Sequence, residues 1–301
     1  MKTFLSLLFS TLLSVSLMAQ TPVSLKLNLE KGKTYAIKNT TKQVVQQGVA
    51  GQSMVVNLVA NHVISFKLLG QENDVLELEM RLDTIATKIN ASMYSKESNS
   101  TQPGKDPIER LQYQMGRFPL KAKFSTSGKF IGFSNLNEYK GKVMLVIDSL
   151  PDSKKDDAKK QADMLLKESA LRSFFEPLFA HLSEKPVNVN DSWESTYMTT
   201  SNDMTFLVFN TYTLKAVENG QAVVSGTSEM ESMPSTNPTV KMDQPIKGNT
   251  TFEGRVDLAT GLFSTLTDKS TLAGAMTVTS NGTEYKVDLK IEGQSESKLF
   301  K

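Results

Sequence analysis

The chain has 301 residues and a formal net charge of +2, from 34 Lys and Arg against 32 Asp and Glu, and 39% of its residues are hydrophobic. This composition provides a sizeable core in one large or two medium domains, and the balanced charge argues against nucleic-acid binding, which calls for a concentrated basic face. The chain contains no cysteine, which excludes disulfides, thiolate metal sites and cysteine nucleophiles.

Residues 1–20 have the pattern of a signal peptide. Lys2 supplies the positive start, Phe4 to Leu17 is an apolar stretch, and Ala19 is a small residue where cleavage is expected. The alternative is a buried helix or a membrane anchor, but the stretch is short for a span and polar sequence follows it. Since a lipoprotein needs a cysteine at the cleavage site, we expect an exported periplasmic or extracellular protein that is not a lipoprotein.

Most of the remaining chain alternates apolar and polar residues. The stretches 75–82, 222–230 and 284–293 show this period of two, which is typical of antiparallel strands with one face in a core. Asn281-Gly282 between two such stretches predicts a tight hairpin. No segment after residue 20 has 18 consecutive apolar residues, so we expect no transmembrane span.

Four landmarks occur twice in the same order, which predicts two copies of one β-module. Chance reuse of common turn chemistry is the alternative explanation. The pairs are 29–35 with 187–193, 66–74 with 212–220, the polar proline-bearing segments 92–107 with 231–245, and the Ser/Thr-Gly hairpins around Gly128 and Gly261. We therefore expect a first β-module at 21–134, a helical segment at 135–186, and a second β-module with a closing hairpin at 187–301.

The segment between the modules has the period of a helix. Pro151 opens a charged helix within 149–168, an earlier helix is expected to begin near Asn137, and Pro177 should break a third helix within 169–182 into short pieces. We expect a mainly β (α+β) fold in which the two antiparallel modules form a curved sheet or half-barrel, with the helical segment packed against it. The sequence leaves open whether the modules form one sheet or two.

The helix within 169–182 has a wide apolar stripe on one face. This stripe is the candidate ligand-binding surface, with the sheet as its other wall. A dry core is the alternative, because burying each large apolar side chain stabilises the fold by about 1.5–3 kcal/mol without any ligand. The candidate ligand-binding residues are Leu171, Phe174, Phe175, Leu178 and Phe179.

Several of these features resemble a family of uncharacterised exported proteins from Bacteroidetes-type bacteria that has only a domain-of-unknown-function label. The resembling stretches are the "AQ" at the end of the leader, "KGKTY", "FSTSGKF" and "PVNVNDSWE" (186–194). The sequence departs from the family at Asn190-Asp191, where a glycine is expected. The family implies no catalytic residues. At the level of fold alone, the expected architecture is similar to periplasmic lipoprotein carriers and lipid-binding half-barrels.

The sequence shows no pattern of an active site. His62 and His181 have no partner at metal-ligand spacing, and neither a nucleotide-binding glycine motif nor a nucleophile elbow is present. We expect no metal, no cofactor and no catalytic residue. Thr84 and Ser149 follow an aspartate in tripeptides similar to the O-glycosylation acceptor of Bacteroidetes, which makes them candidate modification sites.

These observations predict an exported, non-catalytic envelope protein that binds a hydrophobic ligand, such as a lipid, between sheet and helices. One alternative is a scaffold that docks an envelope protein through the polar segments 92–107 and 231–245, since long loops are often functional. Another is a hydrolase with an unrecognised pair of carboxylates. Its oligomeric state is left open.

Overall fold

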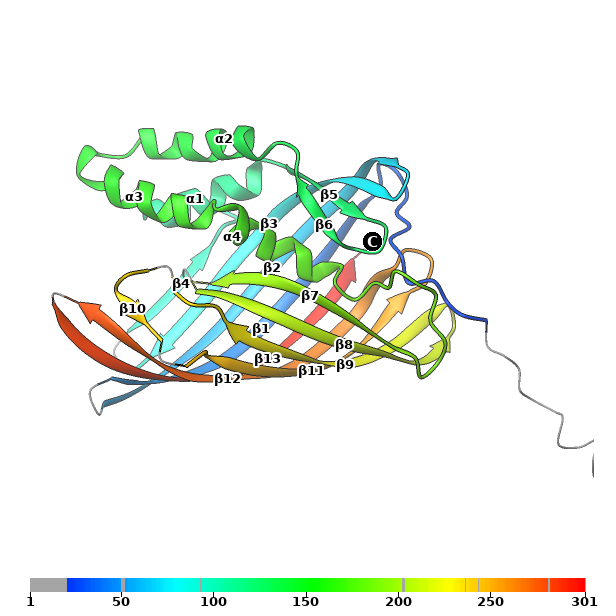
Figure 1. Ribbon diagram of the computed structural model, residues 1–301. Helices are drawn as coiled ribbons and strands as arrows, with labels where there is room; N and C mark the ends of the chain where they lie inside the picture. Colours follow the sequence, from blue (N-terminus) through cyan, green and yellow to red (C-terminus); the bar gives the residue numbers. More distant parts are fainter. Residues whose placement is uncertain are drawn as a thin grey trace, which may run out of the picture.

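The structure is a computed structural model that describes residues 21–49, 52–92, 94–201, 204–235, 237–242, 244–280 and 282–300. The predicted signal peptide at 1–20 lies outside the described residues. The chain is mainly β, with one open antiparallel sheet of 13 strands and four α-helices along its open side (Figure 1). Within the described residues, none of the helices is long and apolar enough to cross a membrane.

Along the chain, α1 lies between β4 and β5, and the other helices lie between β6 and β7. The strands are β1 (Thr34–Val49), β2 (Gln52–Glu72), β3 (Val75–Ala91), β4 (Ser95–Asn99), β5 (Leu120–Ser125), β6 (Phe130–Phe133), β7 (Ser192–Ser201), β8 (Met204–Glu218), β9 (Gln221–Ser232), β10 (Val240–Lys241), β11 (Lys247–Asp257), β12 (Leu262–Ser280) and β13 (Thr283–Phe300). The helices are α1 (Pro107–Arg117), α2 (Leu136–Asp148), α3 (Asp152–Leu165), α4 (Glu168–Phe175) and the 3₁₀ helix η1 (Glu176–Leu178).

The strand order shows two equivalent sets. The sheet runs β6-β5-β3-β2-β1-β13-β12-β11-β9-β8-β7, so each set of five appears from its last strand to its first, with β13 between the sets. All the strands belong to one continuous sheet, which settles the choice between one sheet and two. The predicted mainly β fold with a curved sheet is confirmed.

The turns that pair in the sequence also share a backbone conformation. The first pair is Gly32 (φ 80°) and Asn190 (φ 74°), and the other two pairs also have positive φ, at Asn73 with Asn219 and at Gly128 with Gly261. Asparagine adopts this left-handed conformation more readily than most residues, so Asn190 replaces the expected glycine at little cost. Shared turns and shared strand order are what a duplication would produce; the duplication and its boundaries stay predictions.

The predicted helices around residues 137, 151 and 169 are confirmed as α2, α3 and α4. Pro151 caps the start of α3, and the helical path changes from α4 to η1 at Pro177, as a proline without a backbone N–H requires. The sequence analysis missed α1. Its start has two common features of a helix N-terminus. The Asp106 side chain accepts a hydrogen bond from Glu109 N (2.8 Å), and Pro107 is the first residue of the helix.

The two polar segments, which were interpreted as long loops, each contain a short strand, and the scaffold alternative stays a prediction. Within 92–107, β4 pairs with β3, and the buried Ser100 hydroxyl accepts a hydrogen bond from Ile85 N at 2.7 Å. Within 231–245, β10 pairs with β12. Both segments therefore have backbone groups committed to the sheet.

The main core lies between the concave face of the sheet and α4 with η1. Phe179 at its centre makes edge-to-face contacts with Phe66 and Phe124, at ring-centroid distances of 5.4 and 4.9 Å. The segment before β1 closes this end of the sheet, since Leu27 N donates to Thr126 O and Asn28 N donates to Thr260 O. One short segment thus joins the turns of both recurring hairpins.

Candidate ligand site

A pocket with a volume of about 720 Å³ lies between the concave face of the sheet and the helices, and it is open to solvent beside the exposed residues Gln161, Met164 and Pro177. We call this pocket the interior cavity, because it lies on the inner face of the sheet, and define it by its lining residues. These come from β1 and β2 (Asn39, His62, Ile64), α1 (Ile108), α3 (Gln161, Met164, Leu165), α4 and η1 (Ala170, Ser173, Phe174, Pro177, Leu178) and β7 (Thr199, Thr200). Figure 1 shows the elements that supply these residues, with α4 next to the edge strand β7 on the open side of the sheet.

The apolar stripe of 169–182 divides between this cavity and the core. Phe174 and Leu178 are half-buried and line the interior cavity. Leu171, Phe175 and Phe179 are fully buried in the main core. The structure therefore brings only two of the five candidate ligand-binding residues to the cavity, and the other three pack as the dry-core alternative describes.

Helix α4 is fixed over the cavity by its contact with the edge strand β7. The backbone N–H of Thr200 donates to the hydroxyl of Ser173 at 2.7 Å, and that hydroxyl in turn donates to the carbonyl of Ser169. This bond satisfies one backbone donor on the free edge of the sheet, where unpaired groups would otherwise need water. The roof of the cavity is thus joined directly to one of its walls.

The described lining of the interior cavity contains no Asp, Glu, Lys or Arg. His62 is its one titratable side chain, and it contacts the ring of Phe174 edge-on at 5.9 Å between centroids. Burial lowers the pKa of His62 below its usual 6.5, so the imidazole is neutral at pH 7. The cavity is therefore uncharged and largely apolar.

The other lining residues could not be found from the sequence analysis. Ile108 belongs to helix α1, which was not predicted, and Met164 and Leu165 lie at the end of the charged helix α3. Thr199 and Thr200 come from a strand in the second half of the chain. Only the tertiary fold brings these distant segments together, although the Asp106-Pro107 start signal could have indicated α1.

A chain of polar side chains runs from the cavity across the concave face. Asn39 Nδ2 donates to Ser297 Oγ at 2.8 Å, and the Thr41 hydroxyl lies 2.9 Å from Asn39 Oδ1 and 3.1 Å from Ser295 Oγ. Ser295 donates a hydrogen bond to the carboxylate of Asp268. We call Asn39, Thr41, Ser295, Ser297 and Asp268 the polar belt. It places a carboxylate on the same concave face as the cavity.

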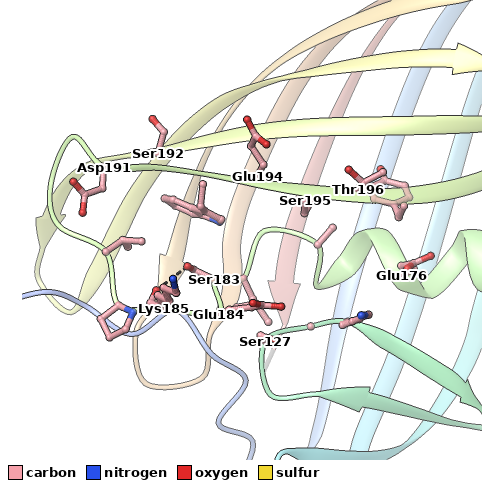
Figure 2. A pocket seen from close by; sticks show the side chains of 18 residues that line it. Ser127, Glu176, Ser183, Glu184, Lys185, Asp191, Ser192, Glu194, Ser195 and Thr196 are labelled. Carbon is pink, nitrogen blue, oxygen red and sulfur yellow. Dashed lines mark hydrogen bonds between the residues drawn. The ribbon is translucent and has the colours of Figure 1, made fainter.

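A second hollow, the edge cleft, lies where the sheet fails to close. Its volume is about 550 Å³, and it lies between the β5–β6 turn, the loop at 182–187 and β7 (Figure 2). Its walls carry charges of both signs, including Lys129, Glu184 and Glu194. Since its walls are charged, the cleft is less suited to an apolar ligand than the interior cavity.

The most buried carboxylate at the edge cleft is already neutralised. Glu176 Oε1 accepts a hydrogen bond from Arg172 Nη2 at 2.7 Å, and the second carboxylate oxygen accepts from Nε. The Arg172 guanidinium also lies 5.0 Å from the centre of the Phe130 ring. This pair keeps Arg172 protonated and raises its pKa. The arrangement ties α4 to β6 and engages Glu176 in an ion pair.

Neither histidine has a catalytic arrangement. His181 is buried in the core, where its Nε2–H donates to Gly261 O at 2.9 Å and its ring packs against Phe263 with a tilt of 38° between the two planes. Its backbone carbonyl accepts a hydrogen bond from Trp193 Nε1. No group of three or more His, Asp or Glu suited to a metal ion occurs among the described residues. The imidazole rings of His62 and His181 thus each contact a phenylalanine, and neither lies beside a described side chain that it could activate as a nucleophile.

His181 should make the stability depend on pH. Burial lowers its pKa from 6.5 to about 4, so between these values the unfolded chain binds more protons than the folded one. The free energy of unfolding should fall by about 3 kcal/mol as the pH decreases from 7 to below 4. His181→Gln keeps a donor for Gly261 O but cannot titrate. Urea unfolding measures the free energy of unfolding of both proteins at pH 7 and below pH 4. The decrease between these two pH values should be larger in the unchanged protein than in His181→Gln by this amount, and equal decreases would contradict the assignment.

The two candidate modification residues lie in different settings. Thr84 is half-buried in β3 beside the register shift opposite Val63, next to exposed Asp83. Ser149 is exposed at the end of α2, and its hydroxyl donates to Val146 O. A large modification is sterically simpler at Ser149, and whether either residue is modified stays a prediction.

Comparisons with known proteins give a family but no activity. A model described as a family of unknown function (DUF6263) matches residues 73–263. No curated protein matches the chain in sequence.

Solved structures with distant similarity to the chain include the following three. Lipovitellin, in a structure entitled "Lipid-protein interactions in lipovitellin", is 11% identical, with 91% of this chain and 26% of that chain covered, at a TM-score of 0.45. An outer membrane channel from Pseudomonas putida F1 is 5% identical (91% and 98% covered, TM-score 0.25). OmpF of Salmonella typhi, in complex with daunomycin, is 8% identical (89% and 98% covered, TM-score 0.23). The chain thus spans about a quarter of the matched lipovitellin chain, and scores this low carry no functional argument.

Proposed function

Since the chain belongs to the DUF6263 family, whose function is unknown, we propose from the geometry of its site that it binds an apolar small molecule in the interior cavity, without catalysing a reaction. The observation that carries the proposal is the uncharged cavity of about 720 Å³ between the concave face and α4. Ligand sites in proteins are typically concave, mostly apolar hollows of about 300–1,000 Å³.

The cavity surrounds an apolar ligand with apolar side chains. Phe174, Leu178 and Ile64 present apolar side chains from opposite walls. Each methylene group that enters such an environment contributes about 0.8 kcal/mol. The few polar groups present, on Asn39 and Gln161, can orient a ligand without repelling an apolar chain.

The concave face has a second apolar surface beyond the polar belt, toward the tips of β12 and β13. Phe206, Ile246 and Leu289 are buried there. The half-buried residues packed around them are Val45, Met204, Met230, Met242, Leu272, Met276 and Ile291. Methionine side chains adapt to irregular shapes, so this surface could accommodate the far end of a long chain. A ligand longer than the interior cavity therefore has somewhere to extend.

Two further parts of the proposal rest on the sequence. The leader pattern at 1–20 and the absence of cysteine support export to the envelope of a Gram-negative bacterium, with release from the membrane. The lack of a recognisable catalytic motif supports a binding role. The intact mass of the protein recovered from a periplasmic fraction tests export, because cleavage near Gln20 removes the first residues; a full-length mass would contradict it.

Leu178→Gln tests the proposed function directly. We expect it to weaken binding of 1-hexadecanol at least tenfold, because an amide facing an apolar chain would lose its hydrogen bonds to water, a cost of about 1–3 kcal/mol. The matched control is Leu145→Gln, the same change at a position on α2 that is 64% exposed and does not line the cavity. Titration of each protein, monitored by native mass spectrometry, gives the affinities.

Ala170→Phe provides a second test of the same cavity by filling it. Its larger side chain should exclude 1-hexadecanol without introducing a polar group, while the melting temperature shows whether the fold is kept. Failure of the unmodified protein to bind 1-hexadecanol, or equal binding by all four proteins, would contradict the proposed function.

A further inference from the structure

The concave face carries negative charge that has no counterion. The lysines of β1, β12 and β13 all fall at exposed positions, namely Lys38, Lys42, Lys269, Lys286, Lys290 and Lys298. Asp268 in β12 lies between exposed Thr267 and Lys269 and is itself half-buried. Because side chains alternate along a strand, Asp268 points to the concave side and the lysines point away from it.

Asp268 makes no ion pair with any described residue. Its carboxylate accepts a hydrogen bond from the hydroxyl of Ser295. Burial raises the pKa of this carboxyl, and the hydrogen bond from Ser295 offsets part of that rise. A half-buried carboxylate with one hydroxyl partner retains free lone pairs. It can therefore accept hydrogen bonds from a ligand that reaches the concave face.

The polar belt connects Asp268 with the interior cavity. Asn39 lines the cavity, and the hydrogen-bonded side chains of Thr41 and Ser295 lead from it to Asp268. Asn39 and Asp268 are on strands two positions apart in the sheet and offset by two residues, which corresponds to about 12 Å. A chain of several methylene groups can span this distance, so one ligand can have its apolar part under α4 and its polar end at Asp268.

The other charged groups near this space do not change its sign. Burial raises the pKa of the Tyr197 hydroxyl, and the negative charges of Glu176 and Asp268 raise it further. These three groups therefore face a common region. Arg172 is engaged by Glu176. His62 is neutral at pH 7, as described above. The net charge that a ligand meets there is negative.

We propose that Asp268 determines the class of ligand, and that the interior cavity takes a long-chain amphiphile with a positively charged amine at its polar end. This inference rests on the proposed function. The amine would supply the missing counterion and donate hydrogen bonds to the carboxylate and to the hydroxyls of Thr41 and Ser295. An anionic end, such as a carboxylate or phosphate, would be repelled and would leave Asp268 unpaired.

Three probes with the same chain length separate this inference from the proposed function. The affinities of hexadecylamine, 1-hexadecanol and palmitate are measured at pH 7.5, below their critical micelle concentrations, by native mass spectrometry. We expect hexadecylamine to bind tightest and palmitate weakest, with at least a tenfold difference between them. If none of the three binds, the proposed function fails; if 1-hexadecanol binds but palmitate binds as tightly as hexadecylamine, only the inference about Asp268 fails.

Asp268→Asn tests the residue itself. The asparagine keeps the size of the side chain and a partner for Ser295 but removes the charge, so the preference for hexadecylamine over palmitate should fall to within about threefold. The matched control is Glu296→Gln, which neutralises an exposed carboxylate on the opposite face of the sheet. An unchanged preference in Asp268→Asn, or an equal loss in Glu296→Gln, would overturn the assignment.

Discussion

Phe179→Ala should lower the free energy of unfolding by about 3–5 kcal/mol, the usual cost of emptying a large aromatic position in a core. Phe179 has 0% of its surface exposed and contacts the rings of both Phe66 and Phe124. Phe174→Ala should cost clearly less, because Phe174 is half-buried and already borders a cavity. Urea unfolding followed by the fluorescence of Trp193, the one tryptophan of the chain, measures both changes.

For ligand binding the order should be reversed, with the larger effect in Phe174→Ala. Phe174→Ala removes a wall of the interior cavity and should weaken binding of 1-hexadecanol, whereas Phe179→Ala should leave the affinity of the folded protein within about threefold. If Phe179→Ala were the variant that lost binding while keeping stability, the division of the helix into a core face and a cavity face would be wrong.

Gly128→Ala and Gly261→Ala should each destabilise the protein by about 3 kcal/mol or more. Both glycines have positive φ, which costs a residue with a Cβ about 1–2 kcal/mol. An added Cβ would also lie inside van der Waals contact with backbone, at Phe179 O for Gly128 and at Lys26 O for Gly261. Since a carbonyl in the main chain cannot move aside as a side chain can, this contact adds a strain of about 1–3 kcal/mol.

Gly282→Ala is the matched control for both. Gly282 also has positive φ (77°), but an added Cβ would meet no atom within 4 Å. It should cost about 1 kcal/mol, from the backbone conformation alone. Equal losses at the three glycines would show that close packing of the recurring hairpins against α4–η1 and the N-terminal segment contributes little.

The sheet could be predicted because its signals are local. Alternation at 75–82 and 284–293 predicts strands that the structure contains as parts of β3 and β13, since one face of each is in contact with the core. Turn residues also determine their own backbone conformation, so Gly128 and Gly261 could be recognised as equivalent hairpin positions.

Helix α1 was not predicted because only a few apolar residues mark its buried face. Leu111 and Met115 are its buried residues, and it follows directly on a polar segment that contains proline and glycine. A helix this short depends on packing against its neighbours, here β3 and α2, for most of its stability. The short strand β4 within 92–107 could not be predicted for a similar reason, because its formation depends on pairing with β3.

The candidate site could be predicted only in outline. The helical period shows that Phe174 and Phe179 belong to one apolar stripe, but it cannot show which side of the stripe packs tightly. That division depends on α3 and β7, which approach Phe174 from distant parts of the sequence. The polar belt was invisible to the sequence analysis for a similar reason, because its members lie on β1, β12 and β13 and meet only through the register of the sheet.

The most direct test of the central claim is the native mass of the protein isolated from the cells that produce it, with no ligand added. If the interior cavity is a binding site, the spectrum should contain a stoichiometric organic adduct that solvent extraction removes and that is absent from Ala170→Phe. A single ligand-free mass, together with no uptake of hexadecylamine, 1-hexadecanol or palmitate, would show that α4 covers nothing more than an imperfectly packed part of the core.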